Sequence, residues 1–343
     1  MCKYFATEMK KTFIIIMATL CFAACKDTRY YRISGYAQGG TWQVKYRGAR
    51  LRPEKVQAGV DSLLSEIDYT LSGYNKASLL SRLNAGDSVV LSRRFFELYG
   101  HSYRMWEASQ GAFDVASGPL FDIWGFGFTS EQLPSGKEIS ECLCNCGTGR
   151  LISPSELESK VGSRICSRDL LKDREAEVLP RLNFNAIAQG YSCDVVAQYL
   201  RSLGVSDMLV DIGEIYCCGV NPSGKGWSIG IDNPVDGNNT PGADIKDIWV
   251  SDGGSYGVVT SGNYRKFYVR DGKKYSHTID PRSGYPVTHN LLSATVIAPS
   301  AWEADALATW FMVIGYDEAR RYLASHPELH ACLITSDSLW KNF

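Results

Sequence analysis

The spacing of apolar and polar residues predicts a chain that mixes helices with strands. Apolar residues recur every three or four positions over 53–72, which is typical of an amphipathic helix, and similar helices are expected at 93–109 and 186–204. Alternation over 40–48 (GTWQVKYRG) predicts a strand instead. Further strands are expected at 207–213, 227–232 and 291–300. Together these elements predict an α+β fold.

Three further stretches refine this prediction. Residues 257–280 should form a hairpin that turns at Asp271–Gly272, because Asp-Gly suits a tight hairpin turn. The polar, Gly- and Ser-rich stretch 135–177 should be the most irregular part of the surface. A last helix should follow the strand at 291–300, and Ser300 with Glu303 has the spacing of a capping box at its start.

Composition bounds the size of the fold and its partners. The chain has 343 residues, of which 45% are hydrophobic, enough for one large domain or two closely packed ones. Its 36 basic and 37 acidic residues give a net charge of −1. Without a basic excess, we expect no nucleic-acid partner.

The N-terminus reads as an export signal. Two lysines follow Met9, an apolar run then extends to Ala24, and Cys25 comes next, so residues 1–24 are expected to be a signal peptide, with Met9 as an alternative start. We interpret Cys25 as the lipidation site of a bacterial lipoprotein, followed by a tether (25–34) and a folded domain (35–343). The alternative is an ordinary cleaved signal with an incidental cysteine. The lipoprotein interpretation predicts a cell-envelope protein anchored by lipid and facing the periplasm, and we favour the inner membrane over the outer.

Eight cysteines remain when Cys2, Cys21 and Cys25 are set aside. Three of them form the run CLCNC at 142–146, and Cys217–Cys218 is an adjacent pair. No histidine or second cysteine pair stands at zinc spacing from the run, so we expect structural cysteines without metal. An exported protein can form disulfides, but the sequence assigns none.

The helix after residue 300 carries two oxygen-bearing side chains in an otherwise apolar stretch. Asp305 and Thr309 are one helical turn apart and therefore share a face. A carboxylate and a hydroxyl suit Mg²⁺, which takes its other ligands from water and phosphates. The helix start would also favour a phosphate group. The plainer alternative is that Asp305 only complements the helix dipole and Thr309 bonds back to the preceding turn.

Other polar residues are candidates for a binding or catalytic site. His277 stands at a strand end before the turn-forming DPRSG, where it can act as a general base or simply bond to a carboxylate such as Asp280. Phe113 and Asp114 lie among small residues and could hold a planar ligand, or Phe113 could belong to the core.

The stretch NFNAIAQGYS brings Asn183, Asn185 and Gln189 to a helix start, where an asparagine can also be only an N-cap. LVDIGEIYCCG reads as a core strand, with Asp211 as a possible functional tip.

Taken in order, nine motifs over about residues 36–320 resemble one family, the ApbE family of FAD:protein FMN transferases. They are GTWQVKY, LSGYNKASLLSRLN, GAFDVASGPL, WGFG, NAIAQGYSCDVVAQYL, LVDIG, TSGNYRKFY, YSHTIDPRSGYPV and VIAPSAWEADALAT. The resemblance implies two closely packed subdomains with a flavin cleft between them, and a catalytic domain over 35–343. It also agrees with an anchored, exported protein.

The resemblance implies a reaction and its partners. FAD would bind with Mg²⁺ on its diphosphate, and a Ser or Thr hydroxyl of an acceptor protein would attack the phosphorus of the FMN half and release AMP. The acceptor would carry a Ser/Thr flavinylation motif, and the family suggests a respiratory electron-transfer subunit.

By motif, His277 would be the base, and Asp305, Thr309 and the Ala186 carbonyl would be the Mg²⁺ ligands. The FAD site would be formed by Gly39, Tyr74, Ala112, Phe113, Asp114, Asn183, Gln189 and Ile279.

Three positions depart from the family pattern. Asn183 replaces a usual Asp, Gly39 stands where many members have Met, and DIGEIY lacks one glycine of the common DIGGEI. We interpret these as tuning. Two alternatives remain: an Mg²⁺-dependent FAD pyrophosphatase in which water replaces the acceptor hydroxyl, and a non-enzymatic flavin-binding lipoprotein.

Overall fold

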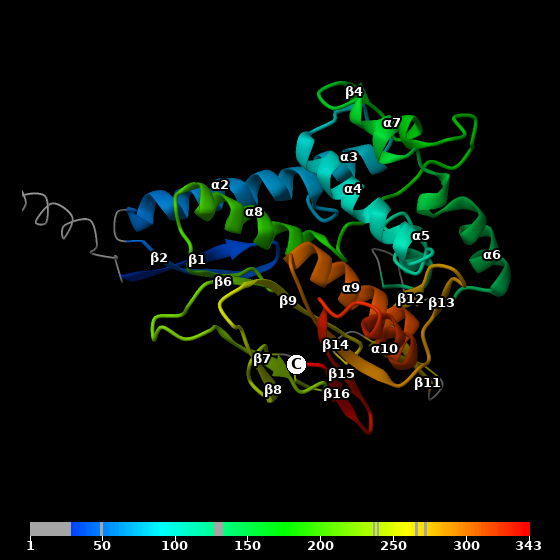
Figure 1. The fold of residues 1–343 in the computed structure, drawn as a ribbon. Coiled ribbons are helices and arrows are strands. Elements are labelled where there is room, and N and C mark those ends of the chain that lie inside the picture. The colour runs from blue at the N-terminus through cyan, green and yellow to red at the C-terminus, as the bar shows by residue number, and fades with distance from the viewer. Residues whose placement is uncertain are drawn as a thin grey trace, which may run out of the picture.

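A computed structural model describes residues 29–48, 51–126, 133–235, 237–238, 240–264, 267–270 and 273–343. It has one large antiparallel sheet with helices packed on it (Figure 1). The predicted α+β class is therefore confirmed. The predicted signal peptide and Cys25 lie outside the described residues.

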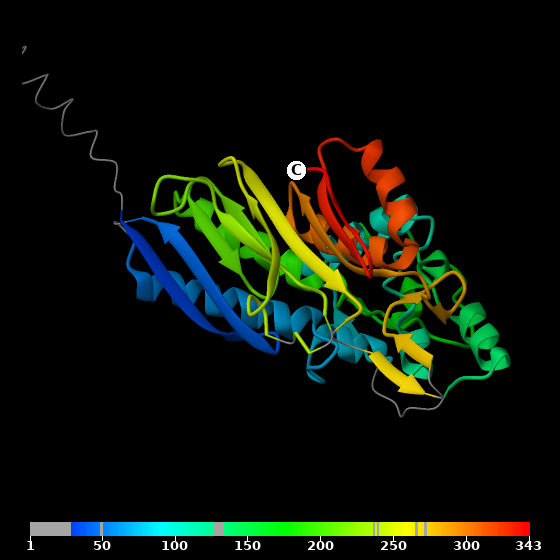
Figure 2. The same cartoon turned by 90° about the horizontal axis from the view of Figure 1, so that it is seen from below.

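The large sheet has eight strands in the order β1-β2-β5-β6-β9-β14-β15-β16. Strands coloured blue, green, yellow, orange and red follow one another across it (Figure 2). Their bounds are Tyr30–Ala37, Gly40–Arg47, Met208–Asp211, Ile215–Cys218, Ser255–Gly262, Leu291–Ala298, His330–Thr335 and Leu339–Lys341. All neighbouring pairs are antiparallel.

Four small two-stranded sheets surround it. They pair β3 (Val89–Val90) with β4 (Arg164–Ile165), β7 (Ser228–Asp232) with β8 (Ile245–Val250), β10 (Phe267–Arg270) with β11 (Lys273–Ser276), and β12 (Ile279–Asp280) with β13 (Tyr285–Pro286). Trp227 directly precedes β7, and Trp249 lies in β8. Both pack in a separate apolar cluster with Cys217, Val258 and Ile297 of the large sheet. The large sheet is therefore covered on the side away from its main helices as well.

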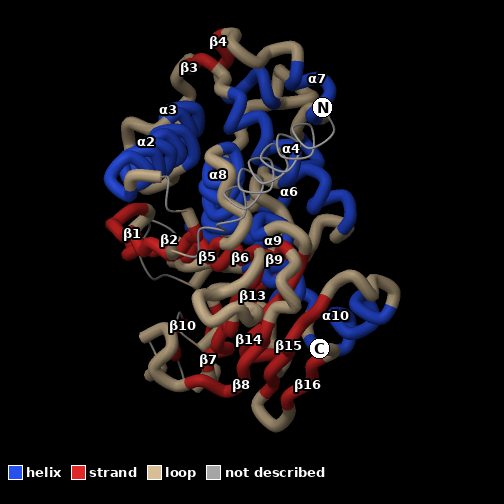
Figure 3. The backbone as a smooth tube through the Cα atoms, turned by 60° about the vertical axis from the view of Figure 1, so that its left-hand side comes forward, coloured by secondary structure: helices blue, strands red, loops and turns tan. Residues whose placement is uncertain are grey.

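The helices lie largely on one side of the large sheet (Figure 3). Helix α2 (Pro53–Leu71) packs on β1 and α8 (Ala188–Ser202), while α9 (Ala301–Ile314) packs on α8, β9 and β14. Buried side chains of these elements form the main core. The other helices are α3 (Leu79–Asn84), α4 (Arg93–Ala108), α5 (Gly118–Ile123), α6 (Gly136–Asn145), α7 (Pro154–Glu158) and α10 (Tyr316–Ala324), with 3₁₀ turns at Thr148–Arg150 and Ser167–Leu170.

Several predicted boundaries are wrong. Tyr30–Ser34 belong to β1 and pair with β2, so the tether cannot extend through residues 25–34. The stretch 135–177 contains α6 and α7, and serine capping boxes at Ser135 and Ser153 explain how helices start in so polar a sequence.

The hairpin expected over 257–280 is two separate elements. Strand β9 belongs to the large sheet, and β10 and β11 form their own pair. Arg270 pairs with Lys273 on either side of the predicted turn, whose two residues lie outside the described part of the chain. The expected core strand LVDIGEIYCCG is likewise two strands, β5 and β6, joined by a tight turn.

Across the described residues, we find no helix with the length and apolar character needed to cross a bilayer.

Candidate functional site

The predicted metal ligand Asp305 lies where α8 and α9 cross. Its side chain is buried, and its Oδ2 accepts a hydrogen bond from the backbone N–H of Gly190 at 3.0 Å. A Cβ atom on Gly190 would lie 2.2 Å from the carbonyl oxygen of Ala301 and 2.8 Å from Cβ of Asp305. Only glycine fits this crossing, and it sets the position of the Asp305 carboxylate.

The Asp305 carboxylate is suited to a cation. Burial raises its pKa to about 7, the Gly190 hydrogen bond opposes that rise, and the charge of Asp194 adds to it. Within the described part of the chain, none of these contributions comes from a cation. A bound divalent ion would supply the missing positive charge.

Thr309 and Ala186 complete the predicted ligand set. Thr309 is half-buried, one turn after Asp305, and its Oγ1 lies 3.4 Å from Oγ of Ser261 at the end of β9. Because the Gly190 N–H donates to Asp305, it does not serve the Ala186 carbonyl four residues earlier, as it would in a continuous helix. One carboxylate, one hydroxyl and one carbonyl form an oxygen donor set that fits Mg²⁺ with water in the remaining positions.

The start of α9 differs from the prediction. Ser300 makes no side-chain cap, so the expected capping box with Glu303 is absent. Instead, the carboxylate of Asp194 on α8 accepts the N–H groups of Ala301 at 3.0 Å and Trp302 at 2.8 Å. Burial raises the pKa of Asp194 to about 6. The first anion at this helix end is therefore a side chain of the protein, and not a phosphate as we expected.

Gln189 packs against the turn between β5 and β6. Its Nε2 donates to the carbonyl of Ile212 at 3.3 Å, and a Cβ atom on Gly213 would lie 3.0 Å from that nitrogen. The N–H of Gly213 donates to Oδ1 of Asp211 at 3.2 Å, which closes the turn. The missing glycine of DIGEIY thus produces a short turn held against the start of α8. Burial raises the pKa of Asp211.

Asp114 and Asn183 lie in two adjoining segments. The Asp114 carboxylate accepts the N–H and hydroxyl of Thr148 and the N–H of Ala116, and burial raises its pKa although these bonds oppose the rise. The backbone N–H of Asn183 donates to the carbonyl of Val115 at 2.7 Å, and the side-chain Oδ1 of Asn183 accepts the N–H of Asn185. The Asn183 side chain thus closes a local turn.

Tyr74 follows the C-terminal end of α2 and contacts the segment of Asn183 and Asn185. Its hydroxyl accepts a hydrogen bond from Nδ2 of Asn185 at 3.2 Å, and its side chain is 64% exposed. The exposed ring lies beside the 183–185 turn.

Three residues predicted to line the FAD site are buried. Ala112 and Phe113 belong to the main core, and Ile279 packs with Leu120 and Trp124. Their side chains serve packing, so a ligand at these positions would meet the backbone. Gly39 is in the β1–β2 turn at φ +81°, and a Cβ atom there would meet nothing within 4 Å. Its neighbour Gln38 donates to Ser192 of α8 at 2.6 Å, which ties this turn to the helix.

His277 is half-buried, and its ring lies edge-on to Phe126 at 6.4 Å between centroids. The next residue, Thr278, donates its hydroxyl to Oδ1 of Asn263, two residues after Ser261. Since Ser261 contacts Thr309, the end of β9 links the segment of His277, between β11 and β12, to α9. The alternative partner Asp280 instead binds Arg282, with two side-chain bonds of 2.9 Å.

The structure therefore gathers Asp305, Thr309 and Gln189 around the start of α8, and Tyr74, Asp114 and Asn183 around the turn that precedes it. Gly190, Asp194 and Thr148 were missed as contributors. Asp194 was detectable as an aspartate on the apolar face of a predicted helix, one turn after Gly190. Thr148 gave no sequence signal.

The described cysteines are all free thiols. A search of the described residues finds no group of three or more His, Cys, Asp or Glu side chains that could hold a metal. That the CLCNC run binds no metal stays a prediction.

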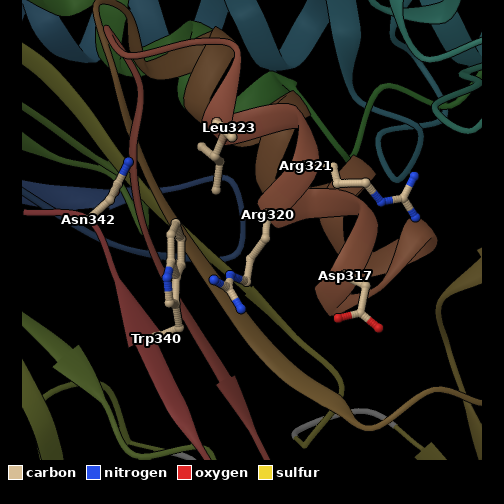
Figure 4. Close-up of a pocket in the computed structure, with 7 residues that line it drawn as sticks. Asp317, Arg320, Arg321, Leu323, Trp340 and Asn342 are labelled. Carbon is tan, nitrogen blue, oxygen red and sulfur yellow. The ribbon is translucent and has the colours of Figure 1, made fainter.

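Two cavities are lined by residues other than the predicted ones. One, of about 610 Å³, lies between α10 and β16, where the Arg320 guanidinium is 5.2 Å from the centre of the Trp340 ring (Figure 4). The other, of about 520 Å³, is lined by His101, Asp194 and Trp302. Neither is lined by a predicted site residue among those the structure describes, so the flavin cleft remains a prediction.

Comparison with known proteins gives one consistent result. The model of the ApbE family matches residues 38–334. The FAD:protein FMN transferases of Haemophilus influenzae and Escherichia coli K12 are each 32% identical to this chain, over 319 and 324 residues, which is 89% of this chain and 87% of each relative.

Solved structures agree with these relatives. The apo flavinyl transferase ApbE of Pseudomonas stutzeri matches with a TM-score of 0.75 at 32% identity, over 92% of this chain and 94% of its own. The flavin transferase ApbE of Vibrio cholerae matches with a TM-score of 0.73 at 28% identity, over 92% of this chain and 96% of its own. The chain belongs to the ApbE family.

Proposed function

We propose that this protein is an FAD:protein FMN transferase. It would transfer FMN from FAD to a Ser or Thr hydroxyl of an exported acceptor protein and release AMP, with Mg²⁺ required. The activity is supported by the family and by the names of its relatives. The observation that carries the metal requirement is the buried Asp305 carboxylate, oriented by the Gly190 N–H and not offset by a nearby cation in the described residues.

The protein's own groups then have distinct tasks. Asp305, Thr309 and the Ala186 carbonyl would hold Mg²⁺, whose positive charge neutralises the diphosphate of FAD. Gln189, Asp114 and the exposed Tyr74 ring would position FAD. The fixed crossing of α8 and α9 keeps the ligand oxygens in place before substrate arrives.

His277 would take the proton of the attacking hydroxyl. The oxygen of the acceptor Ser or Thr bonds to the phosphorus of the FMN half, the bond from that phosphorus to the bridging oxygen breaks, and AMP leaves with that oxygen. The displaced hydroxyl proton goes to the imidazole, which has the pKa range for this work.

The acceptor and the location follow from the same proposal. An acceptor with a Ser/Thr flavinylation motif, in a respiratory electron-transfer subunit outside the inner membrane, would meet an enzyme anchored there through a lipid on Cys25. Labelling with a radioactive fatty acid tests the anchor, since a Cys25→Ser variant should lose the label.

One assay separates the transferase from its alternatives. The purified protein is incubated with FAD, Mg²⁺ and an acceptor peptide that carries the Ser/Thr motif, then flavin fluorescence is read on a denaturing gel and AMP is measured. A fluorescent acceptor with equal AMP supports transfer. AMP without a fluorescent acceptor identifies the pyrophosphatase, and bound FAD without either product identifies a flavin-binding protein.

The metal assignment has its own test. Asp305→Ala should abolish Mg²⁺-dependent turnover, whereas Asp252→Ala should retain it, because Asp252 is an exposed loop carboxylate bonded to Gly254 and Tyr256. Full turnover by Asp305→Ala at saturating Mg²⁺ would show that this carboxylate is not a ligand.

A further inference from the structure

Two of the three cysteines in CLCNC face the same apolar cluster. Cys142 and Cys146 are both half-buried against the cluster formed by Leu120, Trp124, Ile139 and Ile279, whereas Cys144 is exposed. Cys142 lies in the last turns of α6, and Cys146 is its C-cap, with extended backbone at φ −127° and ψ 179°. The two thiols therefore lie one turn apart on the inner side of the helix.

The spacing of these cysteines permits a covalent bond. Four residues of helix advance the chain by about 6 Å, inside the range of about 4.4 to 6.8 Å between Cα atoms that a disulfide spans. The two thiols also influence each other electrostatically, which lowers the pKa of Cys142 and raises that of Cys146. The extended backbone at Cys146 leaves it free to adjust, since it no longer belongs to the helical ladder.

The residues directly after Cys146 hold Asp114. The N–H of Gly147 donates to the carbonyl of Ala116 at 3.1 Å, and Thr148 donates its N–H and its hydroxyl to the Asp114 carboxylate. Asp114 also contributes to the raised pKa of the Cys146 thiol, so the two groups are near each other. A change at Cys146 therefore acts on the hydrogen bonds of Asp114.

Helix α6 also supports the segment that follows His277. It packs on α5 (Figure 1), and Ile139 shares its cluster with Ile279 of β12. The Nε1–H of Trp124 donates to the carbonyl of Gly284 at 2.7 Å, in the turn between β12 and β13. The end of α6 thus lies between two segments that carry candidate site residues.

We propose that Cys142 and Cys146 form a reversible disulfide that loosens the Thr148–Asp114 hydrogen bonds. A small disulfide such as oxidised glutathione is the oxidant. The Cys142 thiolate attacks one glutathione sulfur and expels a glutathione thiolate, and the Cys146 thiolate then attacks Cys142 sulfur and expels the second. Two protein thiols become one disulfide, and one oxidised glutathione becomes two reduced molecules.

Bond formation has a directional effect on the neighbouring loop. It draws Cys146 toward α6, because Cβ atoms four residues apart on a helix are about 5–6 Å from each other and a disulfide requires about 3.5–4.5 Å. Gly147 and Thr148 follow Cys146, and the Asp114 carboxylate loses donors. The consequence for FAD rests on the proposed function: Asp114 is a candidate FAD residue, so the oxidised protein should bind FAD more weakly.

The disulfide is detected by mass. The full-length protein is equilibrated with reduced and oxidised glutathione, its free thiols are alkylated, and it is digested with trypsin. Cleavage after Lys137 and Arg150 releases the peptide 138–150, which contains all three cysteines. After oxidation, this peptide from the Cys144→Ser variant should contain two cysteines that were not alkylated. Its mass should be lower by two hydrogens than the mass of the same peptide with two unalkylated thiols. Cys142→Ser and Cys146→Ser should not show the loss. Full alkylation of Cys144→Ser at the most oxidising ratio would overturn the proposal, as would a disulfide that forms only through Cys144.

The coupling is measured without FAD. Hydrogen exchange of the Thr148 amide should be about tenfold faster in oxidised than in reduced Cys144→Ser, because it loses a bond to a carboxylate. Equal exchange rates would refute the coupling even if the disulfide forms.

FAD affinity is then measured by quenching of flavin fluorescence, and it should fall on oxidation in Cys144→Ser and remain constant in Cys146→Ser. If neither redox state binds FAD, the proposed function fails, while the peptide mass and the amide exchange still decide the disulfide and its coupling.

Discussion

The crossing of α8 and α9 gives a sharp test of how the candidate metal site is held. Gly190→Ala adds one methyl group at the point where the helices touch. The new Cβ would lie 2.2 Å from the Ala301 carbonyl oxygen, 2.7 Å from its carbonyl carbon and 2.8 Å from Cβ of Asp305. Two of these three atoms are backbone, so a change of side-chain rotamer cannot relieve the clash.

The cost follows from these distances. The helices must separate by about 1 Å to restore an ordinary contact, which costs about 1–3 kcal/mol in a close-packed core. The same movement lengthens the 3.0 Å bond from Gly190 to Asp305 beyond hydrogen-bond distance. A lost hydrogen bond to a carboxylate costs about 1.5–3 kcal/mol. Alanine regains about 1 kcal/mol through its better helix propensity, so we expect a net loss of about 1.5–5 kcal/mol.

Urea unfolding followed by far-ultraviolet circular dichroism measures this loss. The matched control is Gly100→Ala in α4, another buried helical glycine, where a Cβ atom would meet only Pro154 at 4.0 Å. That variant should be as stable as the parent or more stable by up to about 1 kcal/mol. Titration calorimetry should show Mg²⁺ affinity at least about tenfold weaker for Gly190→Ala alone. If the two variants unfold within about 0.5 kcal/mol of each other, the crossing is not as tight as we infer.

Three further predictions concern the charges of the site. His277→Ala should retain FAD binding, measured by flavin fluorescence, and lose transfer to the acceptor; loss of binding instead would make its role structural. Without Mg²⁺, the free energy of unfolding should fall as the pH rises from about 4 to about 7, measured by urea unfolding, because the raised pKa values of Asp194 and Asp305 keep protons on the folded protein that the unfolded chain releases. A flat profile would contradict this. Mg²⁺ affinity should rise about tenfold per pH unit below pH 7 and level off above it, measured by calorimetry, since only ionised Asp305 binds the ion; affinity independent of pH would exclude Asp305 as a ligand.

Periodic patterns predicted the long elements well. The helices expected at 53–72 and 93–109 are α2 and α4, and the strand expected at 40–48 is β2. Each has one face in the core, so its burial repeats with the period of its own backbone. The pairing of Asp305 and Thr309 on one helical face was predictable for the same reason.

The contacts between elements were not predictable in this way. The cap of α9 comes from Asp194, which is more than a hundred positions earlier in the sequence, so the local pattern of Ser300 and Glu303 was misleading. A carboxylate on a packed neighbour can meet two helix N–H groups at once, and a local serine then has no donor left to satisfy. The helices within 135–177 were missed because they are short and stand in a polar, Gly- and Ser-rich stretch, where serine caps start them.

The packing around α9 explains how the Asp305 carboxylate is kept buried, with no cation beside it among the described residues. At the start of α9, Gly190 of α8 and Gly257 of β9 both approach too closely for a side chain, since a Cβ atom on Gly257 would lie 2.3 Å from Cα of Ala301. The helix is therefore held from two sides and cannot tilt to bring Asp305 into water. The energy of leaving that charge poorly solvated appears as its raised pKa. A divalent ion beside Asp305 would supply the missing positive charge, so we expect the same packing to favour a bound cation at pH values above the raised pKa of Asp305.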